Sequence, residues 1–157
     1  MRREKRAVTD VQQILQMVDD CQVMHLGLCQ GDQPYVVPLN YGWEWGNGVL
    51  TLFFHAAREG RKADMIREND RCHITLTGQF TLKTADDACG WSGDFWSVMA
   101  QGTVSPIEDE QQRVHALDAI MRHYGHQGKP VYQPGVLART ALYRIRCDEL
   151  TAKRAGS

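Results

Sequence analysis

Short turns between strand-like segments restrict this chain more than any other feature of its sequence. Residues 23–29 and 33–45 have the composition of strands on either side of a Gly31-Asp32 turn. The run Gly46-Asn47-Gly48 then leads into a third strand at 50–55. Strands joined by so few residues pair antiparallel, because a parallel pair needs a crossover of about a dozen residues or more. The order of elements therefore excludes a regular parallel sheet and predicts an antiparallel barrel with helices at its ends.

The strand pattern continues through the second half of the chain. Residues 72–77 and 80–84 resemble a strand pair broken at Gly78, and further strands are expected at 95–104 and 140–147. The total is six or seven strands.

Three helices are expected between these strands. The first covers residues 9–20, with Thr9 and Gln12 as a capping box. The second covers 61–69, and the third, at 108–124, has acidic residues in its first turn. The expected apolar face of the third helix consists of Val114, Leu117, Ile120, Met121 and Tyr124.

The chain has the length and composition of one globular domain, 1–157, with a basic mobile tail at 1–8 and a polar tail at 150–157. Its net charge of −1 provides no strong field, so neither nucleic acid nor a membrane surface is expected as a partner. The first residues lack the apolar segment of a signal peptide, and no apolar run approaches the length of a membrane span.

The cysteines and histidines indicate neither a disulfide framework nor a metal centre. The five cysteines are odd in number and contain no CxxC pair, which is typical of reduced thiols in a cytoplasmic protein. His115, His123 and His126 show no HExxH or comparable spacing. We therefore predict no metal site.

Residues 50–65 combine a strand, a turn with a glycine, and a helix that begins with two cations. His55 ends the strand, Gly60 closes the turn, and Arg61 and Lys62 open the helix. A helix N-terminus attracts anions through its free N–H groups and positive dipole, and cations placed there are locally unfavourable unless an anion binds. The Gly-rich loop of a Walker site is absent. The pattern predicts a phosphate site of another kind.

These residues also have purely structural interpretations. For His55, a structural or surface role explains the residue about as well as a functional one. For the two cations, the structural interpretation is a solvated helix turn. Pro38 cannot donate to a ladder, so residues 38–41 are either a kink in an edge strand or a backbone that addresses a flat ring system. Three aromatic residues are more typical of a core or an interface than of a cofactor site: Trp91, Phe95 and Trp96.

Four motifs of this sequence, taken in order, resemble those of a known family. They are PYVVPLNYG at 34–42, HAAREGRK at 55–62, the CGWS segment at 89–92 followed by Ser97-Val98, and MRHY at 121–124. Together they resemble the nitroimidazole-resistance (Nim) family within the pyridoxamine 5′-phosphate oxidase-like flavin-binding split barrels. The resemblance covers about residues 2–154 and is more specific for the family than for the reaction.

The resemblance implies a six-stranded antiparallel split β-barrel, mainly β with helices, that forms a homodimer with FMN at the subunit interface. By position, Arg61 and Lys62 would hold the FMN phosphate, with Gly60 letting the backbone approach. His55 would sit beside the flavin, where the substrate docks. The other residues implied at the cofactor are Val37, Pro38, Leu39 and Asn40, whose backbone would line the isoalloxazine, Ser97 from the partner, and Lys153, which would close the site.

Two positions depart from the family pattern. Ala152 replaces the glycine before the terminal Lys-Arg, so the Lys153 contact depends on how that methyl group is accommodated. Residues 99–102 (MAQG) replace a Gly-x-Gly-like strand and would reshape the substrate side.

The predicted function is an FMN-dependent oxidoreductase that reduces a small substrate, with nitroaromatic compounds such as 5-nitroimidazoles as candidates. The residues suit FMN independently of the resemblance, because its phosphate is dianionic and its flat ring has polar edges. Two alternatives stay open: a haem-binding split barrel with His55 or a helix histidine as axial ligand, and a flavin-binding protein without turnover. A pyridoxamine phosphate oxidase proper would need a second phosphate-binding cation set, which the sequence does not display.

Overall fold

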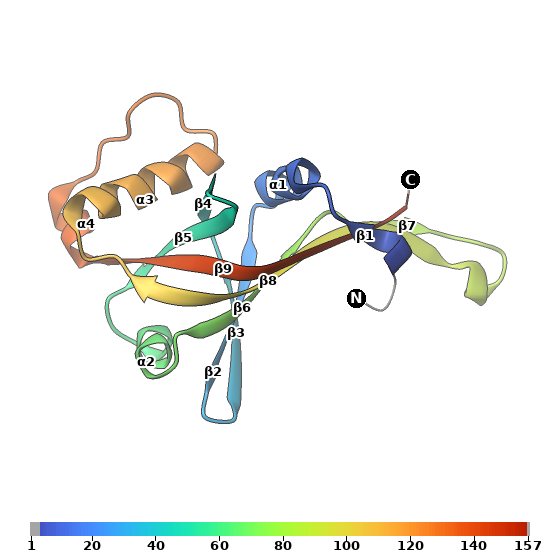
Figure 1. Ribbon diagram of the computed structural model, residues 1–157, viewed down its shortest axis with the longest axis horizontal. Coiled ribbons are helices and arrows are strands. Elements are labelled where there is room, and N and C mark those ends of the chain that lie inside the picture. The colour runs from blue at the N-terminus through green and yellow to red at the C-terminus, as the bar shows by residue number, and fades with distance from the viewer. Residues whose placement is uncertain (1–3, 157) are drawn as a thin grey trace.

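Antiparallel strands make up most of the chain. The computed structural model describes residues 4–156, in which seven strands follow one hydrogen-bonded path, β3-β2-β6-β8-β9-β5-β4 (Figure 1). Two short strands lie off this path, β1 beside β9 and β7 beside β8. The strands are β1 (Ala7–Val8), β2 (Met24–Gln30), β3 (Gln33–Leu39), β4 (Gly42–Gly46), β5 (Val49–Ala57), β6 (Arg71–Thr77), β7 (Thr81–Lys83), β8 (Ser92–Pro106) and β9 (Thr140–Ala155). The helices are η1 (Glu4–Arg6), α1 (Val11–Asp20), α2 (Arg61–Glu68), η2 (Ala88–Gly90), α3 (Glu110–His123) and α4 (Pro134–Arg139).

The sheet is open between β3 and β4, which form its two edges. These strands are consecutive in the chain and are separated only by Asn40 and Tyr41, so the strand expected at 33–45 is broken in its middle. The first half pairs with β2 and the second half with β5. Counted as one broken strand, β3 and β4 complete a path of six strands. The predicted antiparallel split barrel is confirmed, and Pro38 lies in an edge strand as expected.

Tyr41 fills the break between β3 and β4. Its side chain is fully buried, and its hydroxyl lies 2.6 Å from the carbonyl oxygen of Val18 and 2.8 Å from that of Cys21, at the end of α1. Burial raises the pKa of this phenol, so the hydroxyl remains a donor. The Tyr124 hydroxyl, at the end of α3, accepts from the Tyr41 N–H at 3.3 Å and donates to the Gln22 carbonyl. The two tyrosines therefore fix the break against two helices.

The main core lies inside the open barrel, and a smaller cluster lies under α3. Burying a large apolar side chain contributes about 1.5–3 kcal/mol relative to exposure. Phe53 points away from the main core and packs against α3, where Gly42 lets the α3 backbone approach β4 so closely that a Cβ would overlap it. Both faces of β5 are therefore covered. The largest fully buried side chains of the main core include Met17, Met24, Leu26, Leu52, Phe54, Met65, Ile74 and Ile145.

Both predicted tails contribute strands where the structure describes them. Ala7 and Val8 form β1 and pair with Lys153 and Ala152, and β9 continues to Ala155 instead of ending at Cys147. The polar composition after Cys147 concealed this strand, because Ala152 and Ala155 are the only buried residues among 148–155. Residues 1–3 and 157 of the predicted tails lie outside the described residues.

Three other sequence predictions about the helices need correction. Asp10, rather than Thr9, caps α1, and its carboxylate accepts from the Gln12 N–H at 2.9 Å. The region 125–136, expected as loop, contains the start of α4. The apolar face predicted for α3 is correct in part, since Ile120 is buried and Leu117 and Tyr124 pack against the same cluster. The close approach to β4 selects small residues at the centre of the buried face. This face consists of Arg113, Ala116, Ala119 and Ile120.

The expected pairing of 72–77 with 80–84 is wrong. β6 pairs with β2 and β8, whereas β7 pairs with the beginning of β8. The resulting hairpin projects beyond the barrel at the end where β1 lies (Figure 1).

Candidate functional site

The N-terminus of α2 lies in the opening of the split sheet. β4 pairs with β5 only as far as Phe53, so residues 54–57 have no strand partner on that side. Arg61 reaches one side of the opening, with its guanidinium carbon 4.8 Å from the ring centroid of Tyr35 on β3. Lys62 reaches the other side, with its Nζ 5.6 Å from the ring centroid of Phe54 on β5. The first two residues of α2 thus bridge the split.

Gly60 gives this helix an open N-terminus. Its φ of 115° lies in the region that favours glycine, no side chain caps the helix, and nothing lies within 4 Å of the position a Cβ would take. The first backbone N–H to bond back into the helix is that of Asp64, which donates to the Gly60 carbonyl. The N–H groups of Arg61, Lys62 and Ala63 are therefore available to an anion.

The two cations have no acidic partner in the part of the chain that the structure describes. Lys62 is half-buried, and this burial lowers its pKa. Arg61 is exposed except for its contact with Tyr35. An anion held here would stabilise both charges and oppose the downward shift of the Lys62 pKa. The residues of the predicted anion site are therefore close in sequence, and neither cation is paired with a carboxylate among the described residues.

The β3 edge supplies a different type of polar group. Ladder bonds alternate along an antiparallel strand, and Leu26 and Met24 of β2 stand opposite Val37 and Leu39. Proline has no N–H to donate to the ladder, so the alternation of ladder bonds places the backbone groups of Val36 and Pro38 on the free edge of β3. Residues 37–40 were predicted to line the flavin with their backbone. In this arrangement only Pro38 points its carbonyl towards the split, whereas the backbone groups of Val37 and Leu39 pair with β2.

Asn40 sits at the break and is positioned by α3. Its Nδ2 donates to the Tyr124 hydroxyl at 3.0 Å, in the same cluster that holds Tyr41. The side chain of Asn40 is therefore occupied, and its backbone is what remains for a ligand. The sequence did not reveal this link, because Tyr124 was expected to be part of an apolar helix face.

His55 is exposed at the end of β5 and stands opposite Leu142 of β9. Side chains alternate along a strand, so His55 lies on the face of Phe53 and points away from the face on which Lys62 contacts Phe54. The structure thus places His55 next to the anion turn in sequence but on the other face of β5.

Ser97 and Lys153 come together at the opposite end of the molecule. They are register partners on β8 and β9, and Ala7 of β1 pairs with Lys153 on its other side. Ser97 is 7% exposed, and its Oγ has no hydrogen-bond partner among the described residues. The Nζ of Lys153 lies 5.8 Å from the ring centroid of Phe95. A buried hydroxyl without a partner is costly, so this pair is a candidate for contact with a group from outside the chain.

The two departures from the family pattern have simple structural consequences. Ala152 is buried, whereas neighbouring residues of a strand point to opposite faces, so its methyl group does not obstruct Lys153. Within 99–102, Met99 is exposed, and a register irregularity falls between Gln101 and Gly102. The middle of β8 is thus bent at this segment.

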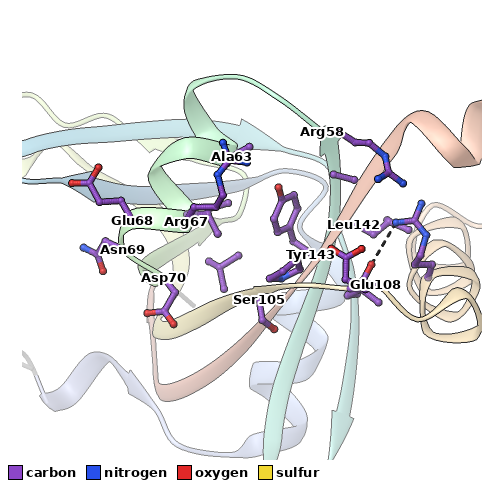
Figure 2. Close-up of a pocket in the computed structure, with 16 residues that line it drawn as sticks. Arg58, Ala63, Arg67, Glu68, Asn69, Asp70, Ser105, Glu108, Leu142 and Tyr143 are labelled. Atoms are coloured by element: carbon purple, nitrogen blue, oxygen red, sulfur yellow. Dashed lines mark hydrogen bonds between the residues drawn. The ribbon is translucent and has the colours of Figure 1, made fainter.

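A cavity of about 660 Å³ lies away from the predicted site (Figure 2). It lies beside the face of α2 that carries Ala63, Ile66 and Arg67, and none of the predicted site residues lines it. Both signs of charge are present on its walls. The charged lining residues are Arg58, Arg67, Glu68, Asp70, Glu108 and Arg113.

Arg113 anchors one wall of this cavity and was missed by sequence reasoning. It is buried, and its guanidinium donates to the carbonyl oxygens of Leu137 and Thr140, each at 2.8 Å. It therefore ties α3 to α4 and the start of β9. Burial also raises the pKa of the Tyr143 phenol, which lines the same cavity. No signal in the sequence distinguishes Arg113 from a solvated helix residue.

No three His, Cys, Asp or Glu side chains between residues 4 and 156 gather in a group that could hold a metal ion. None of the helices described is both long and apolar enough to cross a lipid bilayer.

The open antiparallel barrel, with the uncapped N-terminus of α2 in its split, has the architecture of a pyridoxamine 5′-phosphate oxidase-like split barrel. The family model described as pyridoxamine 5′-phosphate oxidase matches residues 10–154, and the chain belongs to this family. No curated protein gives a significant match.

Solved structures show the same fold. One is a protein from Bacteroides thetaiotaomicron whose suggested role is 5-nitroimidazole antibiotic resistance, with 30% identity, a TM-score of 0.82, and coverage of 94% of this chain and 86% of that one. Another is the flavocytochrome Anf3 from Azotobacter vinelandii, with 21% identity, a TM-score of 0.80, and coverage of 100% and 72%. A third is an FAD and heme binding protein from Mycobacterium smegmatis, with 18% identity, a TM-score of 0.83, and coverage of 97% and 74%.

Proposed function

We propose that this protein is an FMN-dependent oxidoreductase whose cofactor phosphate binds at the N-terminus of α2. The observation that carries the proposal is the open helix end at Gly60, where Arg61 and Lys62 bridge the split without a carboxylate partner among the described residues. A phosphate would take up the free N–H groups and both positive charges. The family of the chain and the flavin-binding proteins that share its fold support the choice of a flavin.

The residues of the split would position the ring of the cofactor. A bound flavin supplies the redox chemistry, and the protein contributes binding, orientation and local charge. The carbonyl of Pro38 and the backbone of Asn40 are available for the polar edges of the ring system. His55 is exposed on the other face of β5, and it would orient the substrate or supply a proton where the flavin ring extends past the strand to that face, since its imidazole can change charge near neutral pH.

A second copy of the chain would complete the site. From Leu142, opposite His55, to Lys153, opposite Ser97, β9 extends roughly 35 Å at about 3.3 Å per residue. Ser97 and the strand end that leads to Arg61 therefore lie far apart along the β8–β9 ladder of one chain. A homodimer would let Ser97 of the partner subunit contact the cofactor held by Arg61 and Lys62, which gives the unpartnered hydroxyl a role.

The substrate class rests on one similarity. The Bacteroides thetaiotaomicron protein with the suggested nitroimidazole role shares 30% identity over nearly the whole chain. We therefore infer that nitroaromatic compounds such as 5-nitroimidazoles are candidate substrates, reduced with electrons from an external donor. A flavin-binding protein without turnover would have the same site. Only an activity assay with an electron donor distinguishes it from an enzyme.

The haem alternative has support from two proteins of the same fold but little from the helix histidines of this chain. A flavocytochrome and an FAD and heme binding protein share the architecture. Here the Nε2 of His115 lies 2.7 Å from a carboxylate oxygen of Glu44, and that of His123 lies 2.9 Å from the carbonyl of Cys21. Both rings are therefore engaged, and an axial ligand would have to come from an exposed residue such as His55.

The visible absorption spectrum of the purified protein, followed by mass analysis of the heat-released compound, tests the proposal. Two flavin bands and the mass of FMN are expected. A Soret band would favour the haem alternative, and a colourless protein that does not take up added FMN would contradict the proposal.

A further inference from the structure

A second pair of cations gathers where β1 pairs with the end of β9 (Figure 1). η1 leads directly into β1, and Ala7 of β1 stands opposite Lys153, so Arg6 lies beside the last residues of β9. The guanidinium carbon of Arg6 is 5.9 Å from the ring centroid of Phe95, and the Nζ of Lys153 is 5.8 Å from the same centroid. Residues from both ends of the chain thus converge on one aromatic ring of β8.

The two cations are half-buried and lack a counter-charge. Neither Arg6 nor Lys153 forms an ion pair with another side chain that the structure describes. The face of an aromatic ring attracts a cation, which explains one positive charge beside Phe95. Two like charges that share one ring repel each other, and partial burial reduces the screening of this repulsion by solvent. An anion bound between them would turn the repulsion into attraction.

The neighbouring carboxylates on the two strands do not supply this anion. Asp94 precedes Phe95 on β8 and therefore lies on the opposite face of the strand, where its carboxylate pairs with Lys83 at 2.7 Å. Glu149 lies on the same face of β9 as Lys153, but it is four residues away, roughly 13 Å at about 3.3 Å per residue. The counter-charge is therefore expected from a ligand.

A buried hydroxyl lies beside the two cations. Ser97 follows Phe95 by two residues on β8 and is the register partner of Lys153, so the three side chains share one face of the sheet. The Oγ of Ser97 is buried and has no hydrogen-bond partner among the described residues. An unpaired buried hydroxyl is unfavourable, so a ligand that accepts its hydrogen bond would be stabilising. Two unpaired charges and one unpaired donor call for an anion with several acceptor oxygens.

We propose that Arg6, Ser97 and Lys153 form a second anion site, which binds the phosphate group of a small ligand. A phosphate monoester carries a charge of about −1.5 to −2 at pH 7 and has enough oxygens for both cations and the hydroxyl. A carboxylate would leave one cation uncompensated. Because the α2 turn follows the opposite end of the β5–β9 ladder, the two anion sites of one chain are separate.

The position of the second site indicates which ligand carries the phosphate. This step alone rests on the proposed function, in which Ser97 of the partner subunit contacts the flavin. The single phosphate of FMN is then held at the α2 turn, so a phosphate beside Ser97 belongs to a second ligand, either a phosphorylated substrate or a nucleotide that donates electrons. The existence of the second site does not depend on this assignment.

Titration of the full chain with inorganic phosphate, followed by phosphorus NMR, tests the second site. Every variant carries Arg61→Ala and Lys62→Ala, so that the α2 turn no longer contributes, and binding of one phosphate per chain is expected in this background. Adding Arg6→Gln should raise the Kd for phosphate at least about tenfold, because a charged hydrogen bond is lost. The matched control is Lys5→Gln, which removes the same charge from an exposed position of the same η1 turn.

A second matched pair tests the β9 side of the site. Lys153→Gln should weaken phosphate binding as Arg6→Gln does. Arg154→Gln should leave it unchanged, because Arg154 lies on the opposite face of β9. Chemical denaturation of each variant verifies that it is folded.

Weaker binding in Arg6→Gln and Lys153→Gln alone would support the proposal. No phosphate binding in the background, or equal weakening by the two controls, would overturn it, and acetate that binds as tightly as phosphate would overturn the phosphate assignment. Flavin uptake is measured separately with the α2 turn intact. A chain that takes up flavin but has no second phosphate site overturns this inference alone. A chain that binds phosphate through Arg6 but takes up no flavin overturns the proposed function alone.

Discussion

The two halves of the candidate site are built in different ways. The α2 half gathers Gly60, Arg61 and Lys62 from adjacent positions of one turn, and its charges are accessible. The other half joins Ser97 and Lys153 from strands that are far apart in sequence, and its key hydroxyl is buried without a partner. The first half depends on local backbone geometry, whereas the second depends on the register of β8 against β9.

This difference decides what a substitution does to each half. Side chains at the helix start can be removed with little effect on folding, since they are exposed or half-buried and make few contacts. Changes near Ser97 alter the packing of the long strands, so they affect both cofactor binding and the stability of the fold. The following predictions separate the two cases.

The double substitution Arg61→Ala with Lys62→Ala should give the largest effect on cofactor binding. Each lost charged hydrogen bond removes about 1.5–3 kcal/mol, so the Kd for FMN should rise at least about a hundredfold. The free energy of unfolding without cofactor should change little. Titration of flavin fluorescence measures the affinity, and Arg58→Ala in the same turn is the matched control. If this variant purifies with full flavin, the phosphate does not bind at this turn.

His55→Ala should retain flavin and lose turnover. A group that donates a proton or aligns the substrate contributes about 10²–10⁴ in rate, and His55 makes no contact with Arg61 or Lys62 across β5. Steady-state reduction of an accepted nitroaromatic compound measures kcat, while the flavin spectrum measures occupancy. Unchanged kinetics would exclude His55 from the reaction.

Gly78→Ala should disrupt the half of the site that contains Ser97 and Lys153, because the added methyl group overpacks it. A Cβ on Gly78 would overlap the indole of Trp96, next to Ser97, and overpacking of this kind costs about 1–3 kcal/mol of stability. Chemical denaturation measures the loss. Gly46→Ala, at a position with nothing within 4 Å of the new methyl group, should be much milder. Equal losses from both would show that Trp96 can move aside freely.

Ser97→Ala should produce the smallest effects, with opposite signs in two measurements. Removing a buried hydroxyl that lacks a partner should leave the free protein as stable or raise its unfolding free energy by about 1 kcal/mol. The same change should weaken FMN binding by about 1 kcal/mol, since the hydroxyl of the partner subunit would be lost. A loss of stability together with unchanged FMN affinity would assign Ser97 to folding.

The sequence predicted the local features well. The turn at Gly46-Asn47-Gly48 and the start of α2 at Arg61 lie where the composition placed them. The broken strand around Pro38 also lies at a sheet edge, because a missing N–H limits where proline can sit. Such features depend on the preferences of a few adjacent residues.

Features that depend on distant partners were predicted less well. β9 was ended at Cys147, because its last residues are mostly polar and exposed, with only Ala152 and Ala155 buried, and carry no strong strand signal. The buried face of α3 was predicted only in part: Ile120 is buried as expected, but Ala116 and Ala119 were missed, since close packing on Gly42 favours alanines over larger side chains. β7 was paired with the wrong strand, because composition does not state which neighbour a short strand takes.

By itself, the sequence determined that this protein is an antiparallel barrel with a glycine-opened, cationic helix start, because turn chemistry and strand periodicity act over a few residues. Tertiary structure alone decided that this helix start bridges the opening between β3 and β5, that His55 faces away from it, and that Ser97 lies beside Lys153 at the far end of β9. The physical reason is that strand register and the closing of a sheet are set by the packing of the whole core, which no local segment encodes.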